Sequence, residues 1–242
     1  MDAIRIENLT KRYKDVTAVD GLSLTVKQGE LFSLLGVNGA GKTTTIKILS
    51  CLAAPDGGDA WILGHGIRTD GTEVKKIIAV SPQETAVAPG LTVKENLELM
   101  CGVHGFSREK RAERIEELTT LLGLQSVLDK KAGKLSGGWQ RRLSIAMALI
   151  SQPKILFLDE PTLGLDVLAR AELWDLIRSL KGEITVILTT HYMEEAEALS
   201  DRIAIMANGR LLKCDTVEMI KADTNASNLE EAFIRIVRGV GA

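Results

Sequence analysis

The sequence lacks the features that mark secreted or disulfide-stabilised proteins. It has three cysteines, Cys51, Cys101 and Cys214, which lie far apart and show none of the spacings typical of metal ligands. An odd number of scattered cysteines favours reduced thiols in a cytosolic protein over a disulfide framework or a zinc site. The first residues, MDAIRIENLTKRY, contain no secretory apolar stretch.

Long hydrophobic runs and an excess of charge are missing as well. The longest apolar run covers residues 145–150, whereas a membrane-spanning helix needs about 20 residues. If the protein works at a membrane, we expect another chain to supply the spans. Lys and Arg number 30 against 32 Asp and Glu, for a net charge of −2. This balance argues against nucleic acid as a partner, because nucleic-acid-binding domains are usually basic.

What the chain does contain is a glycine-rich loop. Residues 36–43, GVNGAGKT, match the phosphate-loop pattern G-x-x-x-x-G-K-[ST]. The apolar residues 31–35 before the loop predict a buried strand, and residues 43–49 after it predict a helix. The glycines let successive backbone N–H groups face one anion, and the helix N-terminus adds partial positive charge. The alternative is a turn with a chance lysine, and the flanking strand and helix argue against it.

The loop predicts specific contacts to a nucleotide. Lys42 should reach the β- and γ-phosphates, and the Thr43 hydroxyl should ligate Mg²⁺. The expected phosphate cradle consists of Gly36, Val37, Asn38, Gly39, Ala40, Gly41, Lys42, Thr43 and Thr44.

A second chemical element is ILFLDE at residues 155–160. Polar residues at the carboxyl end of a buried parallel strand face the ligand crevice. We expect Asp159 to hold Mg²⁺, through water, and Glu160 to orient or deprotonate the attacking water. The alternative is that this pair caps a helix beginning near Pro161 and Thr162.

Strand and helix patterns alternate along the chain and predict an α/β fold with a mostly parallel sheet. Residues 85–153 read mainly as helices and form a helical insert, in which Thr92 and Glu95 have capping-box spacing. The expected strands are 4–6, 22–26, 31–35, 60–63, 76–80, 155–158, 185–188 and 202–206, with a loop at 54–59 and a helix, loop and helix from residue 217.

Residues 135–138, LSGG, complete an ordered set of motifs with the phosphate loop, Gln83, ILFLDE, Asp166 and His191. This set resembles the ATP-binding-cassette ATPases over residues 4–235, which leaves residues 236–242 as a tail. The resemblance implies a P-loop NTPase fold with an N-terminal antiparallel β subdomain.

The resemblance also implies roles for individual residues. Tyr13 would stack on adenine, and Gln83 would touch Mg²⁺ and the attacking water and link to a membrane partner. His191 would contact the γ-phosphate, and Asp166 would cross a dimer interface. The opposite subunit's γ-phosphate would be bound by Ser136, Gly137 and Gly138. The implied catalytic set is Glu160, His191, Gln83 and Lys42, and the implied metal set is Thr43, Gln83 and Asp159.

Two positions depart from the family pattern. Trp139 stands where the signature commonly has Gln, and Val37 stands where the phosphate loop often has Pro. Trp139 leaves the phosphate-facing donors in place, and we expect it to pack against the helical insert or a partner chain.

We therefore expect the ATPase subunit of a transporter, of the bacterial drug, lipid or sodium exporter branch. The implied ligands are ATP and Mg²⁺, and the implied partners are a membrane permease and a second ATPase subunit in a head-to-tail dimer. The implied location is the cytoplasmic face of the membrane. Two alternatives remain: a non-transport cassette acting on ribosomes or DNA, and a small-molecule kinase, which leaves LSGG unexplained.

Overall fold

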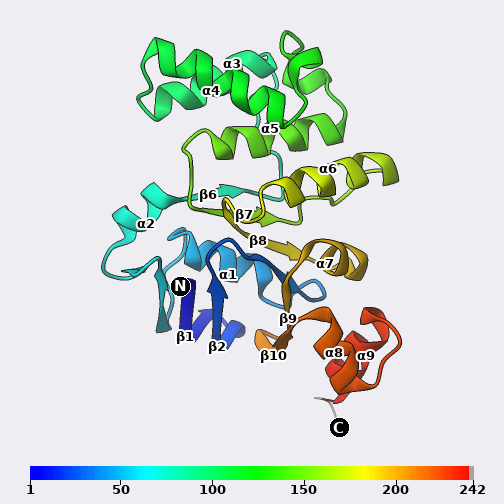
Figure 1. Cartoon of the computed structure of the whole chain (residues 1–242). Coiled ribbons are helices and arrows are strands. Elements are labelled where there is room, and N and C mark those ends of the chain that lie inside the picture. Colours follow the sequence, from blue (N-terminus) through cyan, green and yellow to red (C-terminus); the bar gives the residue numbers. More distant parts are fainter. Residues whose placement is uncertain (240–242) are drawn as a thin grey trace.

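A mostly parallel sheet of six strands lies at the centre of the computed structural model, which describes residues 1–239 (Figure 1). Its order is β10-β9-β3-β8-β7-β6, and β3, β6, β7, β8 and β9 pair in parallel, while β10 forms an antiparallel hairpin with β9. The predicted parallel core is therefore confirmed. The strands are β3 (Leu31–Leu35), β6 (Ile78–Ser81), β7 (Ile155–Asp159), β8 (Thr185–Thr190), β9 (Arg202–Ala207) and β10 (Arg210–Asp215).

The central strands are buried on both faces, which explains why their sequences are apolar throughout. In β7, Leu156 and Leu158 join one core cluster, whereas Ile155 and Phe157 join the other. All four side chains are fully buried. This alternation follows from the two-residue period of a strand.

A second, antiparallel sheet has the order β2-β1-β4-β5 and confirms the expected N-terminal β subdomain. Its strands are β1 (Asp2–Tyr13), β2 (Val16–Lys27), β4 (Gly57–Ile62) and β5 (His65–Gly66). The short strands predicted at 4–6 and 22–26 cover only a part near the start of β1 and a part near the end of β2. Pairing continues to Tyr13 and Val16 at the hairpin end, where the side chains are exposed and carry no apolar pattern.

Two local predictions were wrong. Residues 57–59 were assigned to a loop, but Asp59 pairs with Glu7 and Gly57 pairs with Thr10, so β4 begins earlier. The strand predicted at 76–80 begins only at Ile78, because its first residues end helix α2 (Gly71–Ile77). This helix buries a single residue, Val74, and so has no apolar periodicity to reveal it.

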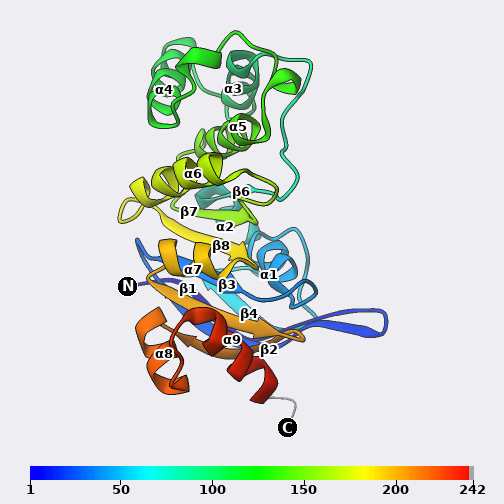
Figure 2. The ribbon, with the colours of Figure 1, turned by 90° about the vertical axis from the view of Figure 1, so that its right-hand side faces the viewer.

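Helices cover both faces of the central sheet (Figures 1 and 2). Helix α1 (Lys42–Leu49) and the antiparallel sheet share one core cluster, while α5 (Gly137–Leu149) and α6 (Val167–Ser179) share the other. Helices α7 (Met193–Leu199), α8 (Val217–Thr224) and α9 (Leu229–Gly239) enclose a third cluster with Leu35, Ile203 and Ile205. The predicted helix–loop–helix after residue 217 is confirmed.

Three helices lie within residues 85–153: α3 (Val93–Val103), α4 (Arg108–Leu121) and α5. Two short 3₁₀ turns, Gln125–Val127 and Ala132–Lys134, lie between α4 and α5. The capping box at α3 is present: the Glu95 N–H donates to Thr92 Oγ1 (3.1 Å), and the Thr92 N–H donates to Glu95 Oε2 (2.7 Å).

Helix α9 runs across the boundary placed at residue 236, and residues 240–242 of the expected tail lie outside the described residues. Within residues 1–239, no helix has the length and apolarity required to cross a membrane.

Candidate nucleotide site

The glycine-rich loop packs closely against the backbone of two strands from different sheets. A Cβ at Gly41 would lie 2.3 Å from the backbone oxygen of Ala18 on β2, and a Cβ at Gly36 would lie 2.4 Å from that of Met206 on β9. Gly41 also has a φ of +99°, which side chains rarely adopt. These two positions therefore require glycine for close approach, and α1 begins at the next residue, Lys42.

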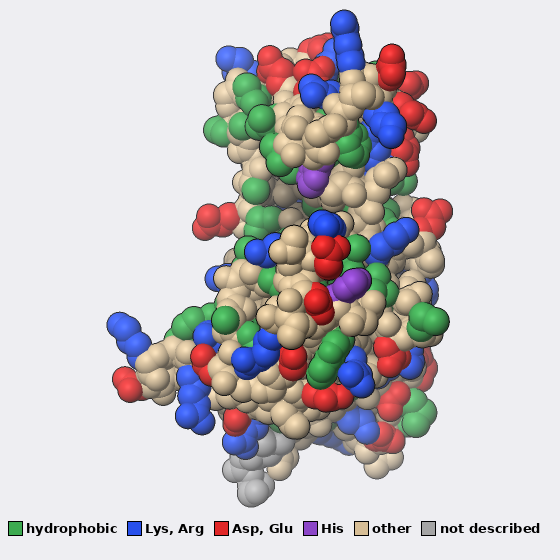
Figure 3. Space-filling view, turned by 90° about the vertical axis from the view of Figure 1, so that its left-hand side faces the viewer, with side chains coloured by type: hydrophobic (Ala, Val, Ile, Leu, Met, Phe, Trp, Pro, Cys, Tyr) green, Lys and Arg blue, Asp and Glu red, His purple; other side chains and the backbone are tan. Residues whose placement is uncertain are grey.

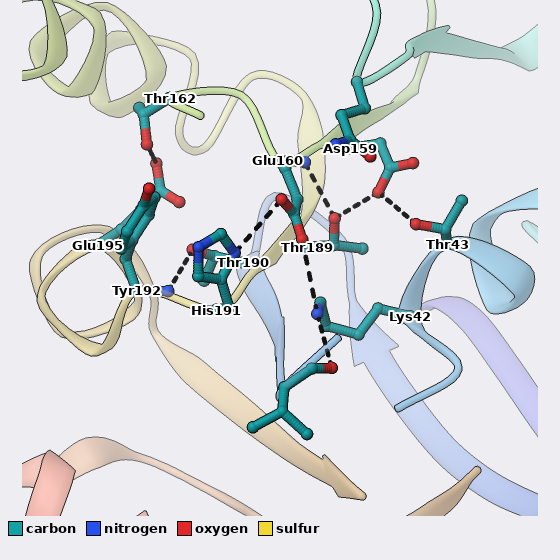
Figure 4. A network of polar contacts seen from close by, with 12 residues as sticks. Lys42, Thr43, Asp159, Glu160, Thr162, Thr189, Thr190, His191, Tyr192 and Glu195 are labelled. Atoms are coloured by element: carbon teal, nitrogen blue, oxygen red, sulfur yellow. Dashed lines mark hydrogen bonds and ion pairs between the residues drawn. The ribbon is translucent and has the colours of Figure 1, made fainter. Parts of the chain in front are cut away.

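Lys42 lies across the loop with its side chain almost fully buried (Figure 4). Its Nζ donates to the backbone oxygens of Gly36 (2.7 Å) and Val37 (3.2 Å) and lies 3.6 Å from Glu160 Oε1. Burial lowers the pKa of Lys42, and the Glu160 carboxylate acts in the opposite direction. A terminal phosphate entering the loop would offer this ammonium a stronger partner than two carbonyls.

Asp159 ends β7 beside the start of α1. Its Oδ1 accepts hydrogen bonds from the hydroxyls of Thr43 (3.0 Å) and Thr189 (2.6 Å). A carboxylate and a hydroxyl on adjacent elements are oxygen donors of the kind that Mg²⁺ takes together with nucleotide phosphates. Among the described residues, no cluster of three or more His, Cys, Asp or Glu could hold a metal by itself.

Glu160 follows in an unusual backbone conformation. Its φ of 45° is in the left-handed region, and its N–H donates to Thr189 Oγ1 at 3.0 Å. Such strained conformations cluster at functional sites. The alternative that Asp159 and Glu160 cap a helix is wrong, because α6 begins only at Val167 and its N-cap is Asp166.

His191 comes directly after β8 and faces Glu160. Its Nδ1 lies 3.3 Å from Glu160 Oε2. This contact does not have the geometry of a hydrogen bond, and Nδ1 makes no hydrogen bond to any other described residue. The histidine ring, about a quarter exposed, reaches the same space as Lys42 and Glu160 (Figure 4).

These segments surround one open hollow of about 500 Å³. Five separate parts of the chain meet there: the start of β2, the phosphate loop, Gln83 after β6, the segment after β7 that carries Glu160, and His191 after β8. Sequence reasoning missed the wall formed by Val16, Ala18 and Leu163, whose apolar character carries no motif. The residues lining the hollow are Val16, Ala18, Asn38, Gly39, Ala40, Gly41, Lys42, Thr43, Thr44, Gln83, Glu160, Leu163 and His191.

Tyr13 is not among the lining residues. It is 46% exposed at the end of β1, where Lys11 Nζ lies 5.3 Å from its ring. The turn that joins β1 to β2 projects from the body of the molecule (Figure 2), and at its base Tyr13 pairs with Val16, which lines the hollow. Its stacking on adenine therefore stays a prediction.

The signature residues lie elsewhere, at the start of α5. Ser136 and Gly137 are exposed, and the Ser136 hydroxyl makes no capping hydrogen bond. Gly138 packs against α6, where an added Cβ would lie 3.0 Å from the Ala169 Cβ. Neither these three residues nor Asp166 lines the hollow. Trp139 packs against the core cluster that includes α3, α4 and α5, as one of its two predicted placements required.

Arg141 is a positioning candidate that sequence reasoning missed. This buried side chain on α5 donates to the backbone oxygens of Pro82 (2.6 Å) and Gln83 (2.5 Å). It has no ion-pair partner among residues 1–239, and burial lowers its pKa while Asp159 and Glu195 act in the opposite direction. No motif signals it, because its partners are backbone atoms far away in the sequence.

Residues 19–163 match the family model described as ABC transporter. The chain belongs to the ABC transporter family. Membership confirms the predicted ATP-binding-cassette fold and an ATP-binding, ATP-hydrolysing activity, and it favours the transporter ATPase over the kinase and the non-transport alternatives.

Three curated proteins from different organisms are similar in sequence to this ABC ATPase. The daunorubicin/doxorubicin resistance ATP-binding protein DrrA of Streptomyces peucetius is 42% identical over 94% of this chain and 69% of its own length. The Nod factor export ATP-binding protein I of Burkholderia orbicola is 40% identical over 92% of this chain and 78% of its own length. The human phospholipid-transporting ATPase ABCA3 is 41% identical over 90% of this chain, which spans only 13% of that protein.

Solved structures agree with the fold. An ATP-binding subunit of an ABC transporter is 27% identical and superposes with a TM-score of 0.85, covering 97% of this chain and 99% of its own. An ATP-binding cassette solved as a dimer, in a post-hydrolysis state with ADP and Pi bound, is 30% identical with a TM-score of 0.79 and covers 88% of this chain and 98% of its own.

Proposed function

We propose that this ABC ATPase hydrolyses ATP between two head-to-tail cassettes and so drives export through a separate membrane permease. The observation that carries the proposal is that the predicted ATP-binding residues lie in two separate places on the chain. The phosphate loop, Gln83, Glu160 and His191 surround one hollow, while the signature at the start of α5 is exposed outside it. A second cassette related by a two-fold axis would bring each signature onto the other's ATP.

In this proposal, the chain's own groups act by position and charge. Lys42 leaves the loop carbonyls to bind the terminal phosphates, and Glu160 accepts a proton from the attacking water, which Gln83 and His191 help to orient. Thr43, Asp159 and Gln83 would hold Mg²⁺, which supplies neutralisation of phosphate charge when bound. Tyr13 at the hairpin end would reach the adenine once nucleotide fills the site.

Export is inferred from the relatives. Proteins named for drug resistance and Nod factor export align with more than two thirds of their own length. A subunit of this type would sit at the cytoplasmic face of the membrane, held by its permease. Acidic and basic side chains are interspersed on the face shown in Figure 3, and the net charge is −2, which supports a protein partner over nucleic acid.

Complementation of two inactive chains tests the shared site. Lys42→Ala removes the phosphate-binding lysine but leaves the signature intact. Gly137→Asp leaves the loop intact but places a carboxylate at the exposed start of α5. Each variant alone should be inactive, whereas an equal mixture should recover about a quarter of wild-type activity, because half of the dimers contain one intact composite site.

The matched control mixes Lys42→Ala with the Lys42→Ala/Gly137→Asp double variant, which offers no intact loop. A mixture of the two single variants that is no more active than this control would contradict the head-to-tail site. Co-purification with a polytopic membrane protein, as opposed to ribosomes or DNA, would test the transport assignment separately.

A further inference from the structure

Glu195 is a buried carboxyl group with no role in the chemistry described above. It lies on α7 and has no solvent exposure. Its Oε1 accepts hydrogen bonds from Thr162 Oγ1 (2.7 Å) and Trp174 Nε1 (3.2 Å). Its Oε2 is buried and makes no hydrogen bond of normal geometry to the described residues, although the Thr190 hydroxyl lies near the carboxyl group and acts to lower its pKa. Burying a carboxyl that is only half satisfied costs free energy, so its position calls for an explanation.

The two donors come from the segment that carries the catalytic carboxylate and from the helix that follows it. Thr162 lies two residues after Glu160, and Trp174 is on α6. Glu195 itself lies four residues after His191, one turn into the helix that this histidine precedes. The carboxyl group therefore joins, behind the site, the two segments whose side chains meet in front of it (Figure 4).

His191 has few other restraints. Its Nδ1 makes no hydrogen bond to described residues, and its ring contacts the neighbouring Tyr192 ring at a centroid distance of 4.1 Å. The Tyr192 N–H donates to Thr190 Oγ1 at 3.0 Å, which fixes the backbone just after β8. The direction of the histidine ring thus depends on where the start of α7 sits.

We propose that Glu195 is a positioning residue that holds His191 against Glu160 by binding Thr162 and Trp174 through its Oε1 atom. The proposal rests on the catalytic roles proposed for Glu160 and His191. Both hydrogen bonds are donated to one carboxyl oxygen, so a neutral side chain with an acceptor in that place should serve as well. Burial raises the pKa of the Glu195 carboxyl, against the hydrogen bonds and Arg170, which act in the opposite direction.

The test compares Glu195→Met, which removes the acceptor, with Glu195→Gln, which keeps it. We expect Glu195→Met to lower kcat about tenfold or more while the Kd for ATP changes less than about twofold, because small displacements of catalytic groups reduce turnover strongly. Glu195→Gln should stay within about twofold of wild type. Glu194→Met is the matched control, because Glu194 is exposed on the same helix.

If Glu195→Met folds poorly, the proposal can still be tested with milder variants of the two hydrogen-bond donors. Thr162→Val and Trp174→Phe each remove one donor and should each lower kcat in part. Adding Thr162→Val to Glu195→Met should cause no further loss, because the contact is already gone. Wild-type kcat in both donor variants, or a lower melting temperature with unchanged kcat, would overturn the positioning role.

A double variant separates this proposal from the proposed function. If Glu195 acts through His191, Glu195→Met should add no further loss of kcat to His191→Ala. An equal loss in both backgrounds would overturn the proposal. Full activity of His191→Ala alone would instead refute the role of His191 in the proposed function.

Discussion

Arg141 and Gln83 are joined by a hydrogen bond of 2.5 Å from the guanidinium to the backbone oxygen. A second bond from the same group reaches Pro82. Arg141 lies about one turn after the signature residues on α5, so one buried side chain ties the exposed signature to the glutamine that lines the nucleotide hollow.

Arg141→Met should therefore affect both stability and turnover. Loss of the two charge-assisted hydrogen bonds from this buried side chain should lower the free energy of unfolding by about 1–3 kcal/mol. It should also lower kcat more than ATP affinity, as measured by urea titration, phosphate release and nucleotide binding. Arg142→Met is the control, because Arg142 pairs with the exposed Glu172, and equal effects of the two variants would contradict the prediction.

Glu160→Gln should separate ATP binding from ATP hydrolysis. The amide keeps the size of the side chain but no longer accepts a proton, so turnover should fall by about 10²–10⁴-fold. ATP should still bind and hold two cassettes together, which size-exclusion chromatography with ATP and Mg²⁺ would detect as a dimer. Undiminished phosphate release by this variant would rule out Glu160 as the catalytic carboxylate.

Two glycines of the phosphate loop should respond differently to alanine. Gly39 has a φ of +82° but open space around its Cβ position, whereas Gly41 combines a φ of +99° with a backbone oxygen 2.3 Å away. Gly39→Ala should cost about 1–2 kcal/mol of backbone strain and keep some ATP binding. Gly41→Ala should displace the loop and abolish ATP binding, as measured by calorimetry, and similar binding by both variants would be the contrary result.

The stability of the chain should depend on pH through Glu195. Its pKa is raised from the ordinary value of 4.5, so the folded state prefers the neutral carboxyl, and this contribution is complete below 4.5 and lost as pH rises through the raised pKa. Charged groups facing it are Arg170 on α6 and Arg141 on α5.

Because a glutamine stays neutral, melting temperatures of Glu195→Gln should decline less than those of wild type as the pH rises from 4.5 through the raised pKa of the carboxyl group. Glu194→Gln, at the exposed neighbouring position, should follow the wild-type curve. Parallel curves for wild type and Glu195→Gln would show that the carboxyl group does not titrate in this range.

The sequence predicted those parts of the molecule in which burial or phosphate binding fixes the residue types along a continuous stretch of chain. Strand β3 was predicted with its observed bounds, Leu31–Leu35, because every residue in it is buried, and residues 36–43 were recognised because phosphate binding demands a fixed pattern. Helix α2 was not predicted, since it buries only Val74. Arg141 and Glu195 were missed because their partners, such as Gln83 and Trp174, are close only in the fold.

The exposed start of α5 has a consequence for how ATP is spent in the cell. In the proposed head-to-tail arrangement, a cassette without a partner would bind ATP but would lack the signature donors of the second chain. Such a subunit would hydrolyse little ATP, and the rate of ATP hydrolysis per molecule should rise with protein concentration. An unassembled surplus of this protein would then drain little of the cell's energy supply.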